Sequence, residues 1–304
     1  MRILVTGITG YVGAALAPRL VAAGHNVRGY ARDATRVTAP GVEVVEGDAV
    51  AGTGLDEALD GVDVAYFLIH SMESEANGGF ATQELIAAEH VADAAARAGT
   101  GRIVYLGGLV PAAGDASPHL ASRLAVEETL LDGVPGSVAL RASIVIGARS
   151  RSFRFLVHLV ERLPVLALPG WRENRTAPIG GRDVLALLEA AATAETAAGR
   201  SLDIAGPDTV TYGELVARIR DFMLVGRPEI RFGFTATPIA SRVAAVVAGE
   251  DHGLIGPLMG GLETDLLPRD DAAAALLGVR PHRLDAAIER ALRDWETAEE
   301  LRAR

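Results

Sequence analysis

The sequence contains no lysine, and all 29 of its basic side chains other than histidine are arginines. Schiff-base catalysis requires a side-chain amine, and P-loop nucleotide sites hold phosphates with a lysine, so both kinds of site are excluded. A Tyr-x-x-x-Lys catalytic pair is excluded for the same reason. Ala, Gly, Arg, Val and Leu dominate the composition, which explains the absence as a bias but leaves its chemical consequence unchanged.

The chain also lacks cysteine, and only 5% of its residues are aromatic. Without cysteine there are neither disulfides nor thiolate metal ligands, which fits a reducing compartment. The net charge of −10 argues against a nucleic-acid surface, and the apolar-leaning stretch 238–249 is too short to span a bilayer. Because the N-terminus has the pattern of a strand rather than of a signal peptide, we expect a soluble, cytoplasmic protein that binds neither nucleic acid nor membrane.

The chain begins with an apolar run that is interrupted by Gly7, Gly10 and Gly13. Residues 3–5 suit a strand buried on both faces, and a helix is predicted over 12–23. In this order Gly7 makes the turn, Gly10 lets the backbone approach a phosphate, and Gly13 lets the helix pack on the strand. The helix N-terminus offers free N–H groups to an anion. The pattern predicts a dinucleotide site; the alternative is an ordinary strand–turn–helix with incidental glycines.

Strand-like and helical segments alternate after this motif, which predicts right-handed βαβ units and an α/β fold with a doubly wound parallel sheet, the Rossmann fold. From about residue 207 the alternation of strands and helices gives way to helices joined by short extended segments. We therefore predict a nucleotide-binding domain over 1–206 and a smaller, mainly helical C-terminal lid over 207–304. The predicted strands are 26–30, 42–45, 62–68, 102–106 and 137–140, the predicted helices are 56–59, 80–97, 118–131, 212–225 and 284–299, and the predicted helix-ending glycines are Gly24, Gly61, Gly99 and Gly133.

The residues after the second strand discriminate between NAD and NADP, because NAD-preferring proteins commonly place an acid there. Here Arg28 and Arg32 occur instead, with no acid before Asp33. Arg28 lies within the strand, so Arg32 is the candidate for a 2′-phosphate, and we predict NADP(H) rather than NAD(H). A solvated surface arginine is the alternative. Asp48 follows the third strand as a candidate partner of the adenine, and residues 67–71 leave the fourth strand where a ribose should pass.

Several segments resemble the short-chain dehydrogenase/reductase superfamily, specifically its atypical NmrA-like and sugar-epimerase-like branch. They are residues 6–13 (Thr-Gly-x-x-Gly-Tyr-Val-Gly), Arg32, Gly47-Asp48, residues 140–147 (Leu-Arg-Ala-Ser-Ile-Val-Ile-Gly) and Arg182-Asp183-Val184. Residues 66–72, 105–109 and 117–123 resemble, more narrowly, a bacterial subgroup known only for NAD(P)H binding. The resemblance covers most of the chain and is weaker beyond residue 210. It implies an NAD(P)-binding protein. The oligomeric state stays open, although the two long helices, 80–97 and 118–131, could pair with a second copy in a four-helix interface as in related folds.

The motifs and the resemblance together define a predicted cofactor site. Its residues are Gly7, Thr9, Gly10, Tyr11, Val12, Gly13, Arg32, Asp48, Ala49, Leu68, Ile69, His70, Gly107, Gly108, Ala142, Ser143 and Ile144. The last three should lie beside the nicotinamide if the resemblance holds.

The resemblance also implies where the catalytic residues should be. The typical family uses a serine at the end of the fifth strand and a Tyr-x-x-x-Lys pair on the next helix. Here that strand runs into Gly107 and Gly108, while His119 and Arg123 occupy the tyrosine and lysine positions, one helical turn apart. His119 can exchange a proton near neutral pH, and Arg123 can contact the nicotinamide ribose or a substrate oxyanion. His70 is the second candidate acid–base; a histidine without a chemical role is the alternative for each.

Three functions remain open at this point. The first is an NADP(H)-dependent oxidoreductase acting on a carbonyl, an alcohol or an activated double bond of a small metabolite. The second is a non-catalytic NmrA-like sensor, favoured by the joint loss of the serine, tyrosine and lysine. The third is a redox-neutral epimerase or isomerase, supported only by analogy of fold. We expect the first, with a small-molecule substrate and no catalytic metal, because the remaining histidines have no metal-ligand spacing.

Overall fold

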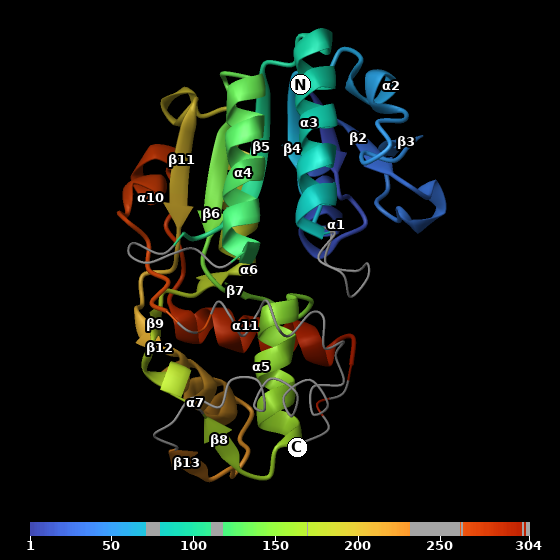
Figure 1. Ribbon diagram of the computed structural model, residues 1–304. Coiled ribbons are helices and arrows are strands. Elements are labelled where there is room, and N and C mark those ends of the chain that lie inside the picture. The colour runs from blue at the N-terminus through green and yellow to red at the C-terminus, as the bar shows by residue number, and fades with distance from the viewer. Residues whose placement is uncertain are drawn as a thin grey trace.

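The computed structural model describes residues 1–70, 80–110, 118–168, 170–231, 262, 264–299 and 301. Its larger part is a seven-stranded sheet whose neighbouring strands all run parallel. The strands are β1 (Arg2–Thr6), β2 (Asn26–Ala31), β3 (Val42–Glu46), β4 (Val64–Phe67), β5 (Arg102–Gly108), β6 (Val138–Ala142) and β11 (Arg200–Ile204). Their order is β11-β6-β5-β4-β1-β2-β3, so the winding reverses at β1 (Figure 1). The predicted doubly wound Rossmann fold is confirmed.

Helices cover both faces of this sheet, because successive side chains of a strand point to opposite faces. Ile3 and Val5 pack with α1, α6 and α10, whereas Leu4 packs with α2, α3 and α4. Nearly every residue of the inner strands is apolar and buried, as a parallel sheet covered twice requires. The bounds of these helices are α1 (Tyr11–Ala22), α2 (Leu55–Leu59), α3 (Phe80–Ala98), α4 (Pro118–Gly133), α6 (Gly181–Ala191) and α10 (Ala272–Leu277), with the short helices η1 (Ala34–Arg36) and η3 (Glu195–Ala197) between them.

A smaller part lies beyond the carboxyl ends of the strands (Figure 1). Its apolar core combines buried residues of the ranges 146–171, 210–223 and 284–295 with Leu262 and Leu301, so the chain enters this part more than once. The division at residue 206 stays a prediction. The elements here are β7 (Val145–Ile146), α5 (Arg151–Arg162), β8 (Leu166–Leu168), η2 (Gly170–Glu173), β9 (Arg175–Thr176), β10 (Ile179–Gly180), β12 (Val210–Thr211), α7 (Tyr212–Phe222), β13 (Glu229–Arg231) and α11 (Leu284–Glu296).

The helix-ending glycines were predicted with one error. Gly24, Gly61 and Gly99 have φ values of 84°, 65° and 72°, the left-handed conformation expected after a helix. Gly133 is instead the last residue of α4 and does not have a positive φ. A Cβ at Gly133 would lie 2.7 Å from the Cβ of Ala92, so this glycine permits the close approach of α3 and α4.

No helix within the described ranges is long and apolar enough to cross a membrane. The apolar-leaning stretch 238–249 lies outside the described residues.

Candidate cofactor and substrate site

The glycine turn between β1 and α1 is shaped by backbone contacts that exclude side chains. Gly7 has a φ of 63°, and a Cβ there would clash with the carbonyl group of Leu68, which follows β4. A Cβ at Gly13 would lie 2.8 Å from the Cα of Ile8 and would clash with the carbonyl oxygen of Gly7. The Gly10 N–H donates to that same oxygen at 2.9 Å. Gly7 and Gly13 are therefore required by the fold of the turn itself.

The N-terminus of α1 is open toward the turn. Gly10 is its N-cap and no side chain caps it, and the first turn contains no acidic residue. The first N–H groups of a helix have no partner within the helix, so they remain available to an anion. Among the described residues other than its chain neighbours, only the Gly7 oxygen comes within 4 Å of the position of a Cβ at Gly10. This cradle of exposed backbone fits a pyrophosphate group.

The arginines within β2 and directly after it, Arg28 and Arg32, have different environments. Arg28 is buried, and its guanidinium donates to three backbone carbonyls at the end of α2 at 2.8–3.2 Å. It therefore caps that helix and is not available to a ligand. Arg32 is exposed directly after the strand. Asp33 caps the helix η1 by accepting hydrogen bonds from the N–H and the hydroxyl of Thr35, which hold the pKa of its carboxyl below the usual range.

The loop after β3, which holds the predicted adenine partner Asp48, is fixed from several sides. The Asp48 N–H donates to the Thr53 hydroxyl at 3.0 Å, and the Tyr30 hydroxyl donates to the Thr53 carbonyl at 2.6 Å. The carbonyl of Ala49 contacts Nδ1 of His90, from α3, at 2.9 Å. Sequence reasoning missed Tyr30 and His90, since nothing in their local pattern links them to this loop.

A cluster of charged and titratable side chains lies where β4 ends and α3 and α4 begin. Nη1 of Arg123, on α4, contacts Nδ1 of His70 at 2.9 Å and its Nε2 at 3.2 Å. Oε1 of Glu84, on α3, lies 3.5 Å from Nδ1 of His70 and 3.9 Å from Nη1 of Arg123. Arg123 and Glu84 are buried, whereas the His70 side chain is 28% exposed. The structure thus brings together two predicted catalytic residues and adds Glu84, which its sequence spacing did not single out.

This contact determines the protonation state of His70. A guanidinium has only donors, so the ring nitrogen that it contacts must accept, which requires a neutral imidazole. Burial and the positive charge of Arg123 lower the pKa of His70, and Glu84 opposes them. The buried Nε of Arg123 has no hydrogen-bond acceptor among the described residues. Arg123 therefore brings a positive charge and an unpaired donor to the end of β4.

The strand β5 ends without a catalytic side chain. Gly107 and Gly108 occupy the position where the typical family has serine, and Gly108 pairs with Ala142 of β6. Tyr105 is fully buried and donates from its hydroxyl to the Arg123 carbonyl at 3.4 Å. Burial raises the pKa of Tyr105, so it is not a substitute for the missing tyrosine acid.

The residues predicted beside the nicotinamide join the sheet to the smaller part. The backbone of Ala142 and of Ile144 accepts from Leu109 at 3.1 Å and from Ile179 at 3.0 Å. The buried Ser143 hydroxyl lies 3.1 Å from that of Thr176.

Tyr11 of the glycine motif makes a second junction. A Cβ at Gly147 would lie 3.0 Å from Cζ of Tyr11, and a Cβ at Gly181 would lie 3.5 Å from it and clash with its hydroxyl. Burial and the nearby Asp294 carboxylate raise the pKa of Tyr11 to about 12. This phenol is protonated at neutral pH and serves as a spacer between α1, α6 and the smaller part.

Some predicted residues are only partly covered. Thr9 is exposed beside Gly10, Val12 follows Tyr11 in the first turn of α1, and Leu68 and Ile69 lead from β4 to His70. His119 lies in the first turn of α4, but its side chain, like Ser71 and residues 111–117, is outside the described residues.

Comparison with known proteins shows the family of the chain. A model of the NmrA-like family matches residues 1–131. The (4-alkanoyl-5-oxo-2,5-dihydrofuran-3-yl)methyl phosphate reductase of Streptomyces griseus is 33% identical over 237 residues, 76% of each protein. An uncharacterized protein of Mycobacterium tuberculosis is 26% identical over 247 residues, which are 81% of this chain but 25% of that longer protein.

Solved structures show the same fold along the whole chain. UDP-glucose 4-epimerase of Thermotoga maritima superposes with a TM-score of 0.77 at 13% identity, covering 99% of this chain and 100% of the other. UDP-glucuronic acid 4-epimerase of Bacillus cereus, in complex with UDP-glucuronic acid and NAD, gives 0.74 at 16% identity, covering 98% and 100%.

Proposed function

Since the chain belongs to the NmrA-like, atypical branch of the short-chain dehydrogenase/reductase family, we propose that it is an NADP(H)-dependent reductase of a small metabolite. One observation carries the proposal. The backbone that closes the glycine turn, at Leu68, continues directly to His70, which contacts the buried Arg123. The glycine turn that would bind a pyrophosphate and the Arg123 cation that would contact a reacting oxygen therefore lie along the same edge of the sheet.

The substrate that we propose contains a carbonyl group, or a double bond activated by one. The Streptomyces griseus relative is named for a furanone whose ring double bond is conjugated with the ring carbonyl and with the alkanoyl carbonyl. Reduction of such a bond places negative charge on a carbonyl oxygen, and reduction of a ketone does the same. A fixed cation beside that oxygen serves both reactions.

Each residue of the site has a separate proposed role. NADPH, when bound, supplies a hydride, and Gly10 with the first N–H groups of α1 would hold its pyrophosphate. The guanidinium of Arg123 stabilises the negative charge that develops on the substrate oxygen. His70, held neutral, orients Arg123 through its ring nitrogen. We propose His119, one turn earlier on α4, as the proton donor, with His70 as the alternative.

Turnover separates this proposal from its main alternative, the NmrA-like sensor that the glycines at the serine position favour. We expect NADPH oxidation with (4-butanoyl-5-oxo-2,5-dihydrofuran-3-yl)methyl phosphate, hereafter the furanone probe, or with its free alcohol. His119→Ala should lower this rate by about 10²-fold and leave NADPH binding intact. NADPH binding without oxidation by any conjugated or simple ketone would favour the sensor. An undiminished rate in His119→Ala would remove His119 from the mechanism.

The choice of NADPH over NADH is proposed to depend on Arg32. Loss of a charge-assisted bidentate contact costs about 1.5–3 kcal/mol, so Arg32→Ala should weaken NADPH binding by about 10- to 100-fold and leave NADH binding nearly unchanged. Fluorescence titration with each cofactor measures both. Arg36→Ala, an exposed arginine on η1, is the matched control. An equal loss for both cofactors would contradict the 2′-phosphate contact.

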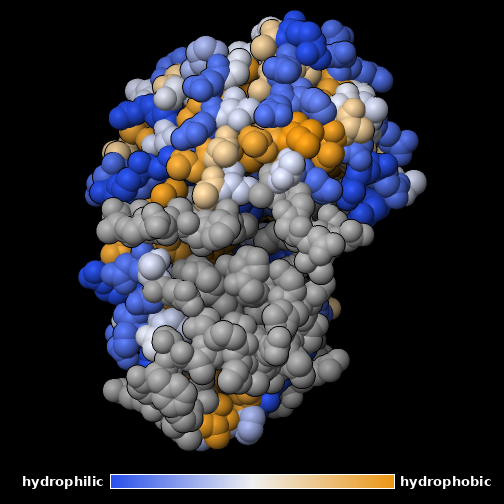
Figure 2. Space-filling view, in the orientation of Figure 1, coloured by the Kyte–Doolittle hydropathy of each residue, from blue (hydrophilic) through white to orange (hydrophobic). Residues whose placement is uncertain are grey.

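The helices α3 and α4 also offer a surface for a second copy. Figure 2 shows apolar side chains gathered on the face of the molecule where these helices lie. Ile86 of α3 and Leu124 of α4 are only partly buried. These observations support a homodimer through a four-helix contact. The lack of cysteine supports a cytoplasmic site of action.

A further inference from the structure

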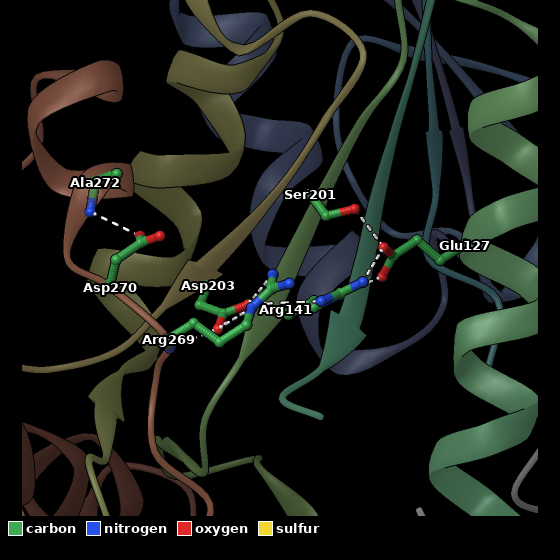
Figure 3. A network of polar contacts seen from close by, with 7 residues as sticks. All are labelled: Glu127, Arg141, Ser201, Asp203, Arg269, Asp270 and Ala272. Carbon is green, nitrogen blue, oxygen red and sulfur yellow. Dashed lines mark hydrogen bonds and ion pairs between the residues drawn. The ribbon is translucent and has the colours of Figure 1, made fainter. Parts of the chain in front are cut away.

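A buried network of alternating charges lies at the far edge of the sheet, away from the glycine turn. Figure 3 shows it running from Glu127 on α4 through Arg141 on β6 and Asp203 on β11 to Arg269, in the segment that leads into α10. The side chains of Glu127, Arg141 and Asp203 are 4%, 9% and 2% exposed, whereas Arg269 is 47% exposed. Two carboxylates and two guanidiniums make the network neutral as a whole.

The first half of the network fixes α4 against the sheet. Arg141 donates from Nε and Nη2 to the two oxygens of Glu127 at 2.8 and 2.6 Å, and the Ser201 hydroxyl of β11 also donates to this carboxylate. Such a bidentate pair has a narrow geometry. Glu127 lies one turn after Arg123, so both side chains leave α4 on the same face. The position of the Glu127 contact therefore determines how far Arg123 extends toward His70.

The second half joins the network to the smaller part. Arg269 donates to Asp203 from its backbone N–H at 2.8 Å, from Nε at 3.0 Å and from Nη2 at 2.8 Å. Just before it, the Leu266 N–H donates to the Arg175 carbonyl of β9 at 2.9 Å, and Asp265 pairs with the Arg175 side chain at 2.7 Å. Arg269 thus marks the point where the chain passes from the smaller part to the sheet.

The two halves compete for one guanidinium. Nη1 of Arg141 lies 4.0 Å from Oδ1 of Asp203, while its other donors bind Glu127. A buried carboxylate that loses its partner seeks another charge, because an unpaired buried charge is costly. Without Arg269, Asp203 would draw Arg141 away from Glu127 and loosen the hold on α4.

We propose that Arg269 is a positioning residue that sets the placement of Arg123 through Asp203, Arg141 and Glu127. The contact of the segment 264–271 with the sheet is thereby coupled to the position of Arg123 in the site. This inference rests on the proposed role of Arg123 in the reductase. Arg269 itself touches neither the glycine turn nor the His70 cluster. Its influence is carried by the charged contacts that link Arg269 through Asp203 and Arg141 to Glu127 on α4.

The test uses His70 as a reporter, since it contacts Arg123 directly. In the full-length protein with ¹³C-labelled histidine, Arg269→Met should raise the pKa of His70, in the same direction as Arg123→Met but by less. Oxidation of NADPH with the furanone probe should fall by about 3- to 30-fold, because small misplacements of a catalytic group are costly. Arg269→Lys keeps the charge and should recover most of the loss. Arg218→Met, which breaks the exposed Arg218–Asp285 pair, is the matched control.

The double variant Arg123→Met/Arg269→Met decides between positioning and general destabilisation. If Arg269 acts through Arg123, the double variant has the rate and the His70 titration of Arg123→Met alone. An additive loss, or an unmoved His70 in a folded Arg269→Met protein, would overturn the inference. An Arg123→Met protein with the normal rate would overturn the proposed function instead, and His70 would still report the coupling.

Discussion

Replacing Arg123 by methionine is expected to lower kcat for reduction of the furanone probe by about 10²- to 10³-fold, the usual loss when one donor to a developing oxyanion is removed. The guanidinium is buried, and its Nη1 lies 2.9 Å from Nδ1 of His70. Its Nε finds no hydrogen-bond acceptor among the described residues. Methionine keeps the length of the stem but removes the charge. Because we place Arg123 against the substrate oxygen, NADPH binding should change by no more than about threefold, and stopped-flow rates with fluorescence titration measure the two separately.

The same change should alter the titration of His70. Burial and the arginine lower the pKa of His70 and the buried Glu84 raises it, so removal of the arginine takes away one of the two lowering influences and keeps the raising partner. The pKa of His70 should therefore rise, and the imidazolium should pair with Glu84, 3.5 Å away. This pairing lessens the cost of the charge that Arg123 leaves behind.

Two further variants complete this test. Arg123→Lys retains a cation and should keep a larger share of the rate than methionine does. Arg97→Met breaks an exposed pair with Asp56 on the same side of the sheet and should leave both rate and binding unchanged. A loss confined to NADPH affinity would move the role of Arg123 from the substrate oxygen to the cofactor ribose.

The parts of this molecule that sequence reasoning predicted are those determined by neighbouring residues. The turn at Gly7 and Gly13 depends on contacts of a short segment and on one crossing strand, and its spacing is visible in the sequence. The distinction between Arg28 and Arg32 also followed from position, because a residue inside a central strand is buried while one after its end is exposed.

The parts that were missed depend on residues far apart in the chain. Arg123 and His70 are 53 positions apart, and Arg269 and Asp203 are 66 apart. Their contacts arise only from the strand order, which no local pattern determines. Glu84 resembles any acid of an amphipathic helix until the fold places it beside His70. Gly133 was misassigned because a glycine at a helix end can serve either a left-handed turn or, as here, close packing of two helices.

A substitution at Gly10 is expected to abolish cofactor binding while leaving the fold intact. Gly10 has φ −77° and ψ 170°, which any residue adopts, and in the described part of the chain a Cβ there meets only the Gly7 oxygen, at 3.2 Å. Gly10→Ala should therefore fold with a Tm near that of the wild type. Its methyl group, however, would occupy the space through which the pyrophosphate approaches α1. NADPH affinity should fall by about 100-fold or more, equivalent to about 2.7 kcal/mol.

Two other glycines make this result decisive. Gly13→Ala would press a Cβ against the backbone of Gly7 and Ile8, where overpacking costs about 1–3 kcal/mol, so this variant should lose stability together with binding. Gly226→Ala adds a methyl group that no described residue beyond its chain neighbours approaches within 4 Å, and it should change neither. Thermal unfolding of the three variants measures the contribution of each glycine to stability, and NADPH titration measures its contribution to cofactor binding. Wild-type affinity in Gly10→Ala would mean that the phosphates lie elsewhere, and the reductase proposal would lose its cofactor site.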